Sequence, residues 1–151
     1  MSDAPVLNQV NLVASDVDAT VAFYRRLGLA VTDSGEEWPS GSGARHVEVA
    51  IGNGVSLEFD NVKSASVWHS GVRGDATGAG RGATAVIGFA LPSRDAVDAT
   101  YAVLTAAGAV GRQEPYDAFW GARYAVVADP DGNDVGLMSP KDVARRYTPE
   151  V

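Results

Sequence analysis

The sequence predicts an α+β fold in which one unit, a strand followed by a helix and further strands, occurs twice. Residues 17–28 read VDATVAFYRRLG and residues 97–108 read VDATYAVLTAAG, and the two stretches are identical at six positions. Both have the apolar spacing of an amphipathic helix, and short apolar segments of strand character surround each. We interpret the pair as an internal duplication, because a repeated unit constrains the architecture more than local propensity does.

The first copy is expected to extend from residue 5 to residue 60. A strand is expected over residues 6–14 and a helix over residues 17–28, with Ser15 or Asp16 as its N-cap and Gly28 at the left-handed C′ position. Strands over 46–51 and 55–60 flank Gly52-Asn53-Gly54, which is a hairpin signal.

The second copy is expected over residues 83–140. A strand over residues 84–91 precedes a helix that is capped by Ser93 and ends at Gly108. Strands over 123–128 and 135–138 flank the segment Asp129-Pro130-Asp131-Gly132-Asn133, whose composition predicts a turn.

The length of 151 residues suits a single domain. Residues 61–82 are rich in Gly and Ser and carry Trp68 and His69, so we expect a linker or a lid between the copies. The tail, residues 141–151, includes a basic segment of helical tendency, for which a solvated helix face is the default interpretation.

Charge and composition exclude several classes of function. The net charge of −7, from 12 Lys and Arg against 19 Asp and Glu, opposes binding to nucleic acid or to anionic membranes. The chain has no cysteine, which rules out disulfides, a thiolate nucleophile, iron–sulfur clusters and thiolate zinc sites. Neither a signal peptide nor an apolar run of membrane-spanning length is present, so we expect a soluble cytoplasmic protein.

Alternation along the first hairpin separates an apolar face from an acidic one. The apolar face is expected to pack on the helices and comprises Val47, Val49, Ile51, Val55, Leu57 and Phe59. The opposite face comprises His46, Glu48, Ala50, Ser56, Glu58 and Asp60, with Glu48 directly opposite Glu58. A solvated surface is one interpretation of this face. The other is a cavity, because a bound cation or a retained proton would relieve the repulsion between the two carboxylates.

The tryptophans admit two interpretations as well. Trp120, beside Gly121, is either part of the core or a platform for a flat ligand, since glycine leaves space beside the ring. Trp38 and Trp68 lie in segments rich in Gly and Ser, and aromatic residues in loops suggest recognition.

Three features together resemble the vicinal oxygen chelate superfamily. They are the repeat, the run FYRRLG at residues 23–28, and the run WGARY at residues 120–124 with the turn that follows it. This group includes glyoxalases, extradiol dioxygenases and bleomycin-resistance proteins. The resemblance covers about residues 5–140. It implies two βαβββ modules whose mixed sheets curl into a cup with the helices outside, often within a homodimer.

The resemblance also implies where a divalent metal would bind in enzymes of the superfamily. Its four ligand positions fall on Gln9, Glu58, Val86 and Gly136. The last two have no donor atom in their side chains, and one amide and one carboxylate are too few to hold a catalytic metal ion. We therefore expect no metal and no cofactor, unless a rearranged site uses His46, Glu48 and Glu58.

The remaining features resemble the bleomycin- and mitomycin-resistance proteins, which bind a drug without a metal. The prediction is a protein that sequesters a small, partly aromatic and cationic molecule such as an antibiotic, with no catalytic residue. The predicted ligand contacts are Gln9, Asn11, Glu48, Glu58, Trp68, Trp120 and Tyr124. Two alternatives stay open: a lyase, isomerase or dioxygenase-type enzyme with a rearranged metal site or a Glu48/Glu58 acid–base pair, and a regulatory or structural module whose cup is unused.

Overall fold

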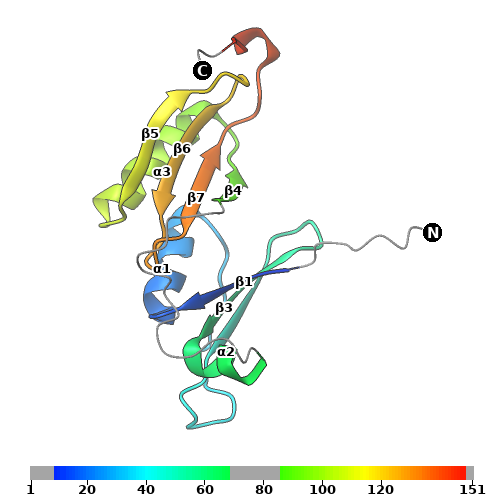
Figure 1. Cartoon of the computed structure of the whole chain (residues 1–151), viewed down its shortest axis with the longest axis vertical. Helices are drawn as coiled ribbons and strands as arrows, with labels where there is room; N and C mark the ends of the chain where they lie inside the picture. Colours follow the sequence, from blue (N-terminus) through cyan, green and yellow to red (C-terminus); the bar gives the residue numbers. More distant parts are fainter. Residues whose placement is uncertain (1–8, 69–85, 149–151) are drawn as a thin grey trace, which may run out of the picture. The chain divides into compact units, whose positions relative to one another are not determined.

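The computed structural model describes residues 9–68 and 86–148, and of residues 66–68 it describes the backbone alone. The chain forms two compact units, Met1–Ala79 and Gly80–Val151 (Figure 1). The boundary between them falls inside the segment that the sequence analysis expects to link the two copies.

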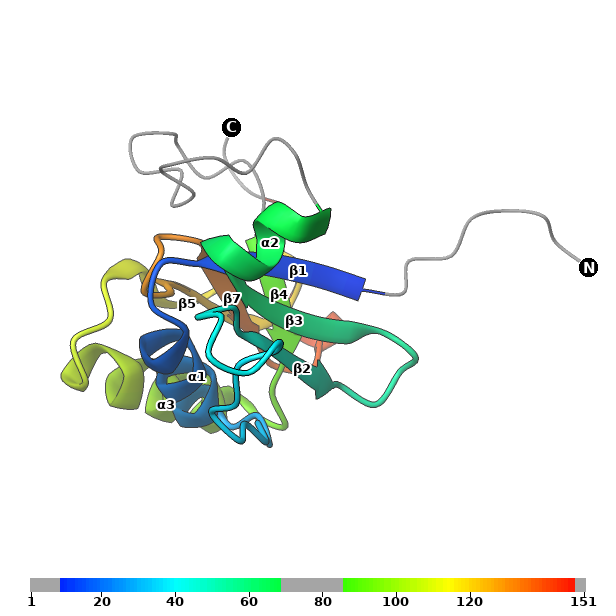
Figure 2. The same ribbon diagram turned by 90° about the horizontal axis from the view of Figure 1, so that it is seen from below.

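The first unit is a three-stranded mixed sheet with one helix on each face (Figures 1 and 2). Its elements are β1 (Gln9–Ala14), α1 (Val17–Leu27), β2 (His46–Ala50), β3 (Ser56–Asn61) and α2 (Val62–Trp68). The strand order is β1-β3-β2, with β1 parallel and β2 antiparallel to β3. Helix α1 begins where the Asp16 side chain accepts the backbone N–H of Ala19, and it ends at Gly28, which has a φ of 115°.

The core of the first unit lies between α1 and the apolar face of the sheet. The ring of Tyr24 stacks on Phe59 at a centroid distance of 4.9 Å, and both residues are buried. The hairpin contributes buried Val47, Val49 and Leu57 to the same face, as the alternation predicts. The remaining face of the sheet is therefore the acidic one.

The second unit is a four-stranded mixed sheet with α3 (Arg94–Ala106) on one face (Figure 1). Its strands are β4 (Val86–Ala90), β5 (Gly111–Asp117), β6 (Arg123–Ala128) and β7 (Asp134–Met138), in the order β4-β7-β6-β5. Strand β4 is parallel to β7, as β1 is parallel to β3 in the first unit. Buried Val97 and Leu104 of α3 pack with the residues of β6 and β7 that point toward the helix, which are Ala125, Val127, Val135 and Leu137.

The prediction of an α+β fold with mixed sheets and few helices is confirmed, and the copies differ in one strand. The second unit has the full βαβββ order, whereas residues 29–45 of the first unit contain no strand. Gly41 and Gly43 hold φ values of 76° and 77° there, and Pro39 has no backbone donor, so this segment is a poor partner for β2. Strand β5 was not predicted, and its burial pattern shows no apolar alternation.

The expected linker and the basic tail each contain a short helix. The expected linker begins with α2, and its later residues, like the expected strand residues 6–8 and 84–85, lie outside the described part of the chain. The basic tail contains a short 3₁₀ helix, Val143–Arg145, whose residues are exposed. Over the residues that the structure describes, no helix has the length and apolar character needed to cross a membrane.

A repeated ion-pair network supports the duplication independently of the helix motif. In the first unit, Arg45 pairs with Asp18 at 2.6 Å and with Asp33 at 2.5 Å. In the second unit, Arg123 pairs with Asp98 at 2.8 Å and with Asp117 at 3.2 Å.

Backbone pairing at these arginines repeats as well. The N–H of Arg45 donates to the Asn61 side chain, and the N–H of Arg123 donates to the Ser139 side chain. Asn61, at the end of β3, and Ser139, directly after β7, donate their own N–H groups back to the arginine carbonyls. The hairpins of the two units are therefore equivalent at an offset of 78 residues.

Candidate ligand-binding site

The acidic face of the first sheet brings polar residues of all three strands together. Glu48 pairs with Glu58 across β2 and β3, which confirms the predicted opposition of the two carboxylates. His46 pairs with Asp60 in the same ladder, and Asn11 of β1 lies beside Glu58. Residues paired in a sheet point to the same side, so these five side chains share one face.

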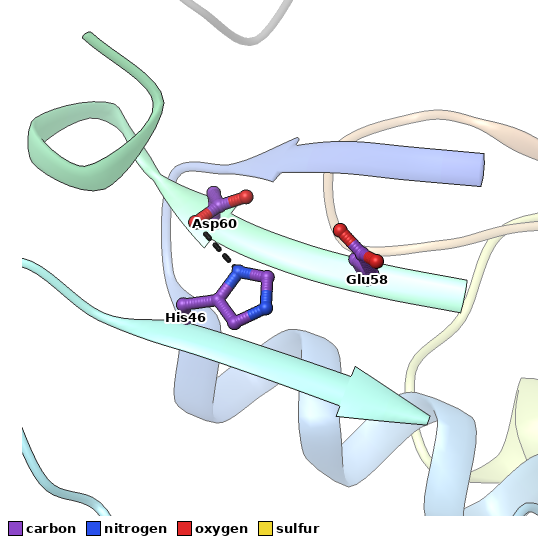
Figure 3. A group of neighbouring side chains, drawn as sticks. All are labelled: His46, Glu58 and Asp60. Carbon is purple, nitrogen blue, oxygen red and sulfur yellow. Dashed lines mark hydrogen bonds and ion pairs between the residues drawn. The ribbon is translucent and has the colours of Figure 1, made fainter. Parts of the chain in front are cut away.

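Asp60 is the centre of this face, and it is 1% exposed. Its Oδ1 lies 3.0 Å from Nδ1 of His46 (Figure 3) and accepts the hydroxyl of Ser64 on α2 at 2.5 Å. Its Oδ2 accepts Nδ2 of Asn11 at 2.6 Å. A buried carboxylate is stable only where donors satisfy its oxygens, and here three side chains do so.

Glu58 lies two residues earlier on β3 and is half-buried. It accepts Nδ2 of Asn11 at 3.3 Å and the hydroxyl of Ser56 at 3.0 Å. His46, Glu58 and Asp60 each offer a donor atom to a cluster in which these atoms all lie within 4.8 Å of one another (Figure 3). The cluster offers one imidazole and two carboxylates to any cation that reaches it.

A cavity of about 1090 Å³ opens over this cluster. Its walls come from the 29–45 segment and from α2, and its floor is the acidic face; the lining residues are Gln9, Asn11, Ser34, Glu36, Trp38, Pro39, Ser42, Ala44, His46, Glu58, Asp60, Lys63 and Ser64. Trp38 leaves 85% of its surface exposed. Drug-sized ligands occupy cavities of about 300–1,000 Å³, so the volume is sufficient for one.

The matching face of the second sheet is chemically different. At the 78-residue offset, Tyr124 stands where His46 stands, Gly136 where Glu58 stands, and Met138 where Asp60 stands. Burial raises the pKa of the Tyr124 phenol, and the neighbouring Tyr116 and Asp134 raise it further, so the hydroxyl stays protonated at neutral pH. Exposed Val86 lies on this face and pairs with Asp134, whose carboxylate forms an ion pair with Arg112 at 3.3 Å. The face is therefore more apolar and less acidic than its counterpart in the first unit.

Trp120 belongs to the second unit and is half-buried. Its ring meets Phe119 and Tyr124 edge-on at centroid distances of 5.0 Å and 5.3 Å, and its indole N–H is buried without a hydrogen-bond partner in the described residues. The space expected at Gly121 is not open. A Cβ there would lie 2.1 Å from the Asp142 carbonyl, so the backbone of the tail fills the space.

The predicted contacts are therefore distributed unevenly. Gln9, Asn11 and Glu58 line the cavity, and Glu48 lies on the same face but outside the lining. Trp120 and Tyr124 lie in the other unit, and the Trp68 side chain lies outside the described residues. Asp60, His46 and Trp38 were not among the predicted ligand contacts. Alternation had placed Asp60 and His46 on the correct face, His46 was considered only for a rearranged metal site, and Trp38 was considered only as an aromatic residue in a loop.

Comparisons with known proteins agree with this architecture. A family model described as the Glyoxalase/Bleomycin resistance protein/Dioxygenase superfamily matches residues 6–137. The chain belongs to this superfamily. None of the curated proteins compared with the chain matches it.

Solved structures show the same fold. A glyoxalase/bleomycin resistance protein/dioxygenase family enzyme from Burkholderia phytofirmans PsJN is 21% identical, with a TM-score of 0.70 over 87% of this chain and 96% of that one. A glyoxalase-related enzyme from Fulvimarina pelagi is 19% identical, with a TM-score of 0.70 over 91% and 89%. Lactoylglutathione lyase from Agrobacterium tumefaciens is 21% identical, with a TM-score of 0.59 over 91% and 96%.

The residues at the metal positions implied by the superfamily do not fit a metal ion. Gln9 and Glu58 could each supply an oxygen, but Val86 and Gly136 supply none. A Cβ on Gly136 would lie 2.9 Å from the Tyr124 hydroxyl and 3.2 Å from Cγ1 of Val86, so neighbouring side chains crowd the place where a fourth ligand would begin. The second unit thus lacks its half of the metal site.

Proposed function

We propose that this superfamily member binds a small, partly aromatic and positively charged molecule, such as an antibiotic, without a metal, and thereby sequesters it. The observation that carries the proposal is the cavity of about 1090 Å³ in the first unit, which has two carboxylates, Glu58 and Asp60, in its floor. The proposal extends to a cytoplasmic protein that acts as a homodimer.

Charge supports a cationic ligand. Glu36, Glu58 and Asp60 line the cavity, and the ammonium of Lys63 donates to the Ser42 carbonyl at 3.2 Å. Glu48 adds a carboxylate on the same face, and the whole chain carries a net charge of −7. Three carboxylates against the ammonium of Lys63 leave the described lining with a negative balance, which favours ligands of the opposite sign.

Aromatic recognition is assigned first to Trp38. Among the lining side chains of the described residues, it is the aromatic ring that shares the cavity with the carboxylates. An exposed indole stabilises a cation or a flat ring by about 0.5–2 kcal/mol. Trp68, Trp120 and Tyr124 stay predicted contacts, and the Trp120→Ala variant below tests one of them.

The test is a fluorescence titration of the full chain with bleomycin and with proflavine, a flat aromatic cation. We expect saturable quenching in the parent, and Trp38→Ala and Glu58→Gln variants should bind about tenfold more weakly, a loss of about 1.4 kcal/mol. Glu114→Gln, which removes one exposed carboxylate from β5, serves as the charge control. If neither compound binds, or if both cavity variants bind like the parent, this proposal is wrong.

The Trp120→Ala variant tests the other aromatic assignment. A loss of binding with an unchanged fold would make the second unit part of the site. Unchanged affinity would remove Trp120 from the contacts and leave Trp38 as the platform.

A second candidate is an enzyme with a rearranged metal site, and the cluster of His46, Glu58 and Asp60 favours it. Imidazole and carboxylate donors suit first-row divalent ions. Mass spectrometry of the protein after incubation with nickel, zinc, manganese and ferrous ions distinguishes the two functions. Stoichiometric metal that is lost in a His46→Phe variant would favour the enzyme.

A further inference from the structure

The floor of the cavity has an unusual balance of hydrogen-bonding groups. His46 turns Nδ1 toward Oδ1 of Asp60 at 3.0 Å, and a carboxylate can only accept, so this nitrogen carries the hydrogen. Asn11 directs its amide Nδ2 to both Asp60 and Glu58. These side-chain donors are therefore engaged by carboxylates inside the cluster.

The serine hydroxyls around the cluster are engaged in the same way. Ser64 donates to Asp60, and Ser56 donates to Glu58. Each hydroxyl has one hydrogen to give, so neither retains a donor for a ligand.

Within this cluster, the groups left for a ligand are acceptors. In the neutral form of the imidazole, the hydrogen on Nδ1 leaves a free lone pair on Nε2, and the His46 side chain is 46% exposed. Glu58 has lone pairs beyond its two internal bonds, since a carboxylate can accept about four. Oδ1 of Asn11 also lacks a hydrogen-bond partner in the described part of the chain, but it is buried and is therefore not counted among the acceptors open to a ligand.

We infer that the positive group bound in this cavity is an ammonium that carries N–H hydrogens, as in a primary or secondary amine, and is not a quaternary ammonium. The inference rests on the proposed function and specifies its ligand. An ammonium N–H donates to Nε2 of His46 and to Glu58, and charge-assisted bonds of this kind are about twice as strong as neutral ones. A quaternary ammonium has no donor and would cover both acceptors without satisfying them.

Asp60 has a positioning role in this arrangement. Its bond to Nδ1 fixes the imidazole tautomer that leaves Nε2 as an acceptor. Its burial and its bonds to Asn11 and Ser64 hold the carboxylate in place.

The test uses three probes with one benzyl ring: benzylamine, benzyltrimethylammonium and benzyl alcohol. Dissociation constants come from chemical-shift titrations of the full chain, whose amide spectra also report whether each variant is folded. We expect benzylamine to bind at least about tenfold more tightly than the quaternary compound, as expected for at least one charge-assisted hydrogen bond. Glu58→Gln should weaken benzylamine binding, and Glu114→Gln should leave it unchanged.

The decisive readout is the ratio of the affinities for benzylamine and benzyltrimethylammonium. A merely structural role of His46 would leave this ratio unchanged. His46→Phe should lower the ratio by weakening benzylamine binding alone, while Glu58 retains part of the preference. A quaternary compound that binds as tightly as benzylamine in the parent would overturn the inference and leave the proposed function intact. Benzyl alcohol binding as tightly as both cations would contradict the proposed function itself.

A further titration distinguishes an ammonium site from a metal site that uses the same acceptors. Benzylamine titrations are repeated with zinc chloride or manganese chloride in the solution. Unchanged benzylamine binding supports the inference. Displacement of benzylamine by either ion, lost in His46→Phe, would show that the acceptors hold a metal and would overturn the inference.

Discussion

At the scale of single residues, the most consequential side chain is Asp60, a buried carboxylate on which three donors converge. His46, Asn11 and Ser64 orient toward it, so it sets the conformation of the cavity floor. Nothing in its position along β3 distinguishes it from Glu58, which also alternates onto the acidic face. What distinguishes them is depth, because α2 follows β3 directly and contributes Ser64 beside Asp60.

Replacing Asp60 by Ala should destabilise the first unit by about 2–4 kcal/mol, because three donors lose their acceptor. Urea unfolding checks this, with Asp60→Asn as the partial replacement that keeps one acceptor and Glu114→Gln as the surface control. An Asp60→Ala variant as stable as the parent would show that the donors find other partners.

A second prediction at this scale concerns Tyr124. Burial raises the pKa of its phenol, with contributions from Tyr116 and Asp134. A group whose folded pKa lies above its unfolded value stabilises the fold below the unfolded pKa, and this contribution is lost as pH rises through the folded pKa. The ordinary value is 10.0, so the loss should begin near pH 10.

The measurement is the unfolding free energy of the parent and of Tyr124→Phe between pH 8 and pH 11.5. The parent should lose stability more steeply than the variant above pH 10, and the gap between them should be constant below it. Parallel curves over the whole range would show that the phenol ionises equally in both states.

At the scale of elements, Gly121 joins the β5–β6 connection to the tail. Its φ is 92°, and the Asp142 backbone packs where a side chain would begin. The N–H of Asp142 donates to the Gly121 carbonyl at 3.0 Å, and the Tyr147 hydroxyl donates to the Asp117 carbonyl at 2.9 Å. The tail is thus held against the second sheet at this turn.

Gly121→Ala should therefore destabilise the second unit by at least about 1–3 kcal/mol, from the strained φ and from the displaced backbone. Gly88→Ala is the matched control, because a Cβ at Gly88 meets nothing within 4 Å and its φ is ordinary. Thermal unfolding of both variants checks the difference. Equal stability of the two variants would mean that the tail moves aside at little cost.

At the scale of the whole molecule, the duplication explains what the units share and where they diverge. They share the parallel pairing of first and last strands, the helix after the first strand and the Arg-centred network. They diverge on the face opposite α1 and α3, where His46, Glu58 and Asp60 correspond to Tyr124, Gly136 and Met138. The two units thus share the packing that stabilises the fold and differ on the sheet face that could bind a ligand. This pattern is expected when a fold is retained and its binding face changes.

The two ion pairs of Arg45 should contribute unequally to the free energy of unfolding. The Asp33 side chain is 13% exposed, whereas that of Asp18 is 79% exposed, and both pair with Arg45. Asp33→Asn should cost about 1–3 kcal/mol, because a largely buried guanidinium loses its charged partner, and Asp18→Asn should cost less than about 1 kcal/mol. Urea unfolding of the two variants and the parent measures these differences. Equal losses of unfolding free energy in the two variants would contradict the argument from burial.

The sequence predicted strand faces correctly where apolar and polar residues alternate regularly. Alternation in the first hairpin placed Glu48 opposite Glu58 and separated the buried valines from the acidic face, as the strand register confirms. Strand β5 was missed because it is exposed along most of its length and has no apolar alternation. The argument for space beside Gly121 was wrong, because the tail segment that fills this space is 21 residues away in the sequence.

Local patterns and residue types were sufficient to predict the α+β fold with its repeated unit, the superfamily and the lack of donor atoms at Val86 and Gly136. Tertiary structure decided which polar residues form a site. The burial of Asp60, the acceptor left on His46 and the presence of Trp38 in the same cavity arise from contacts between β1, β2, β3, α2 and the 29–45 segment. Periodicity assigns a residue to a face, but only packing between distant segments fixes its depth and its hydrogen-bond partners.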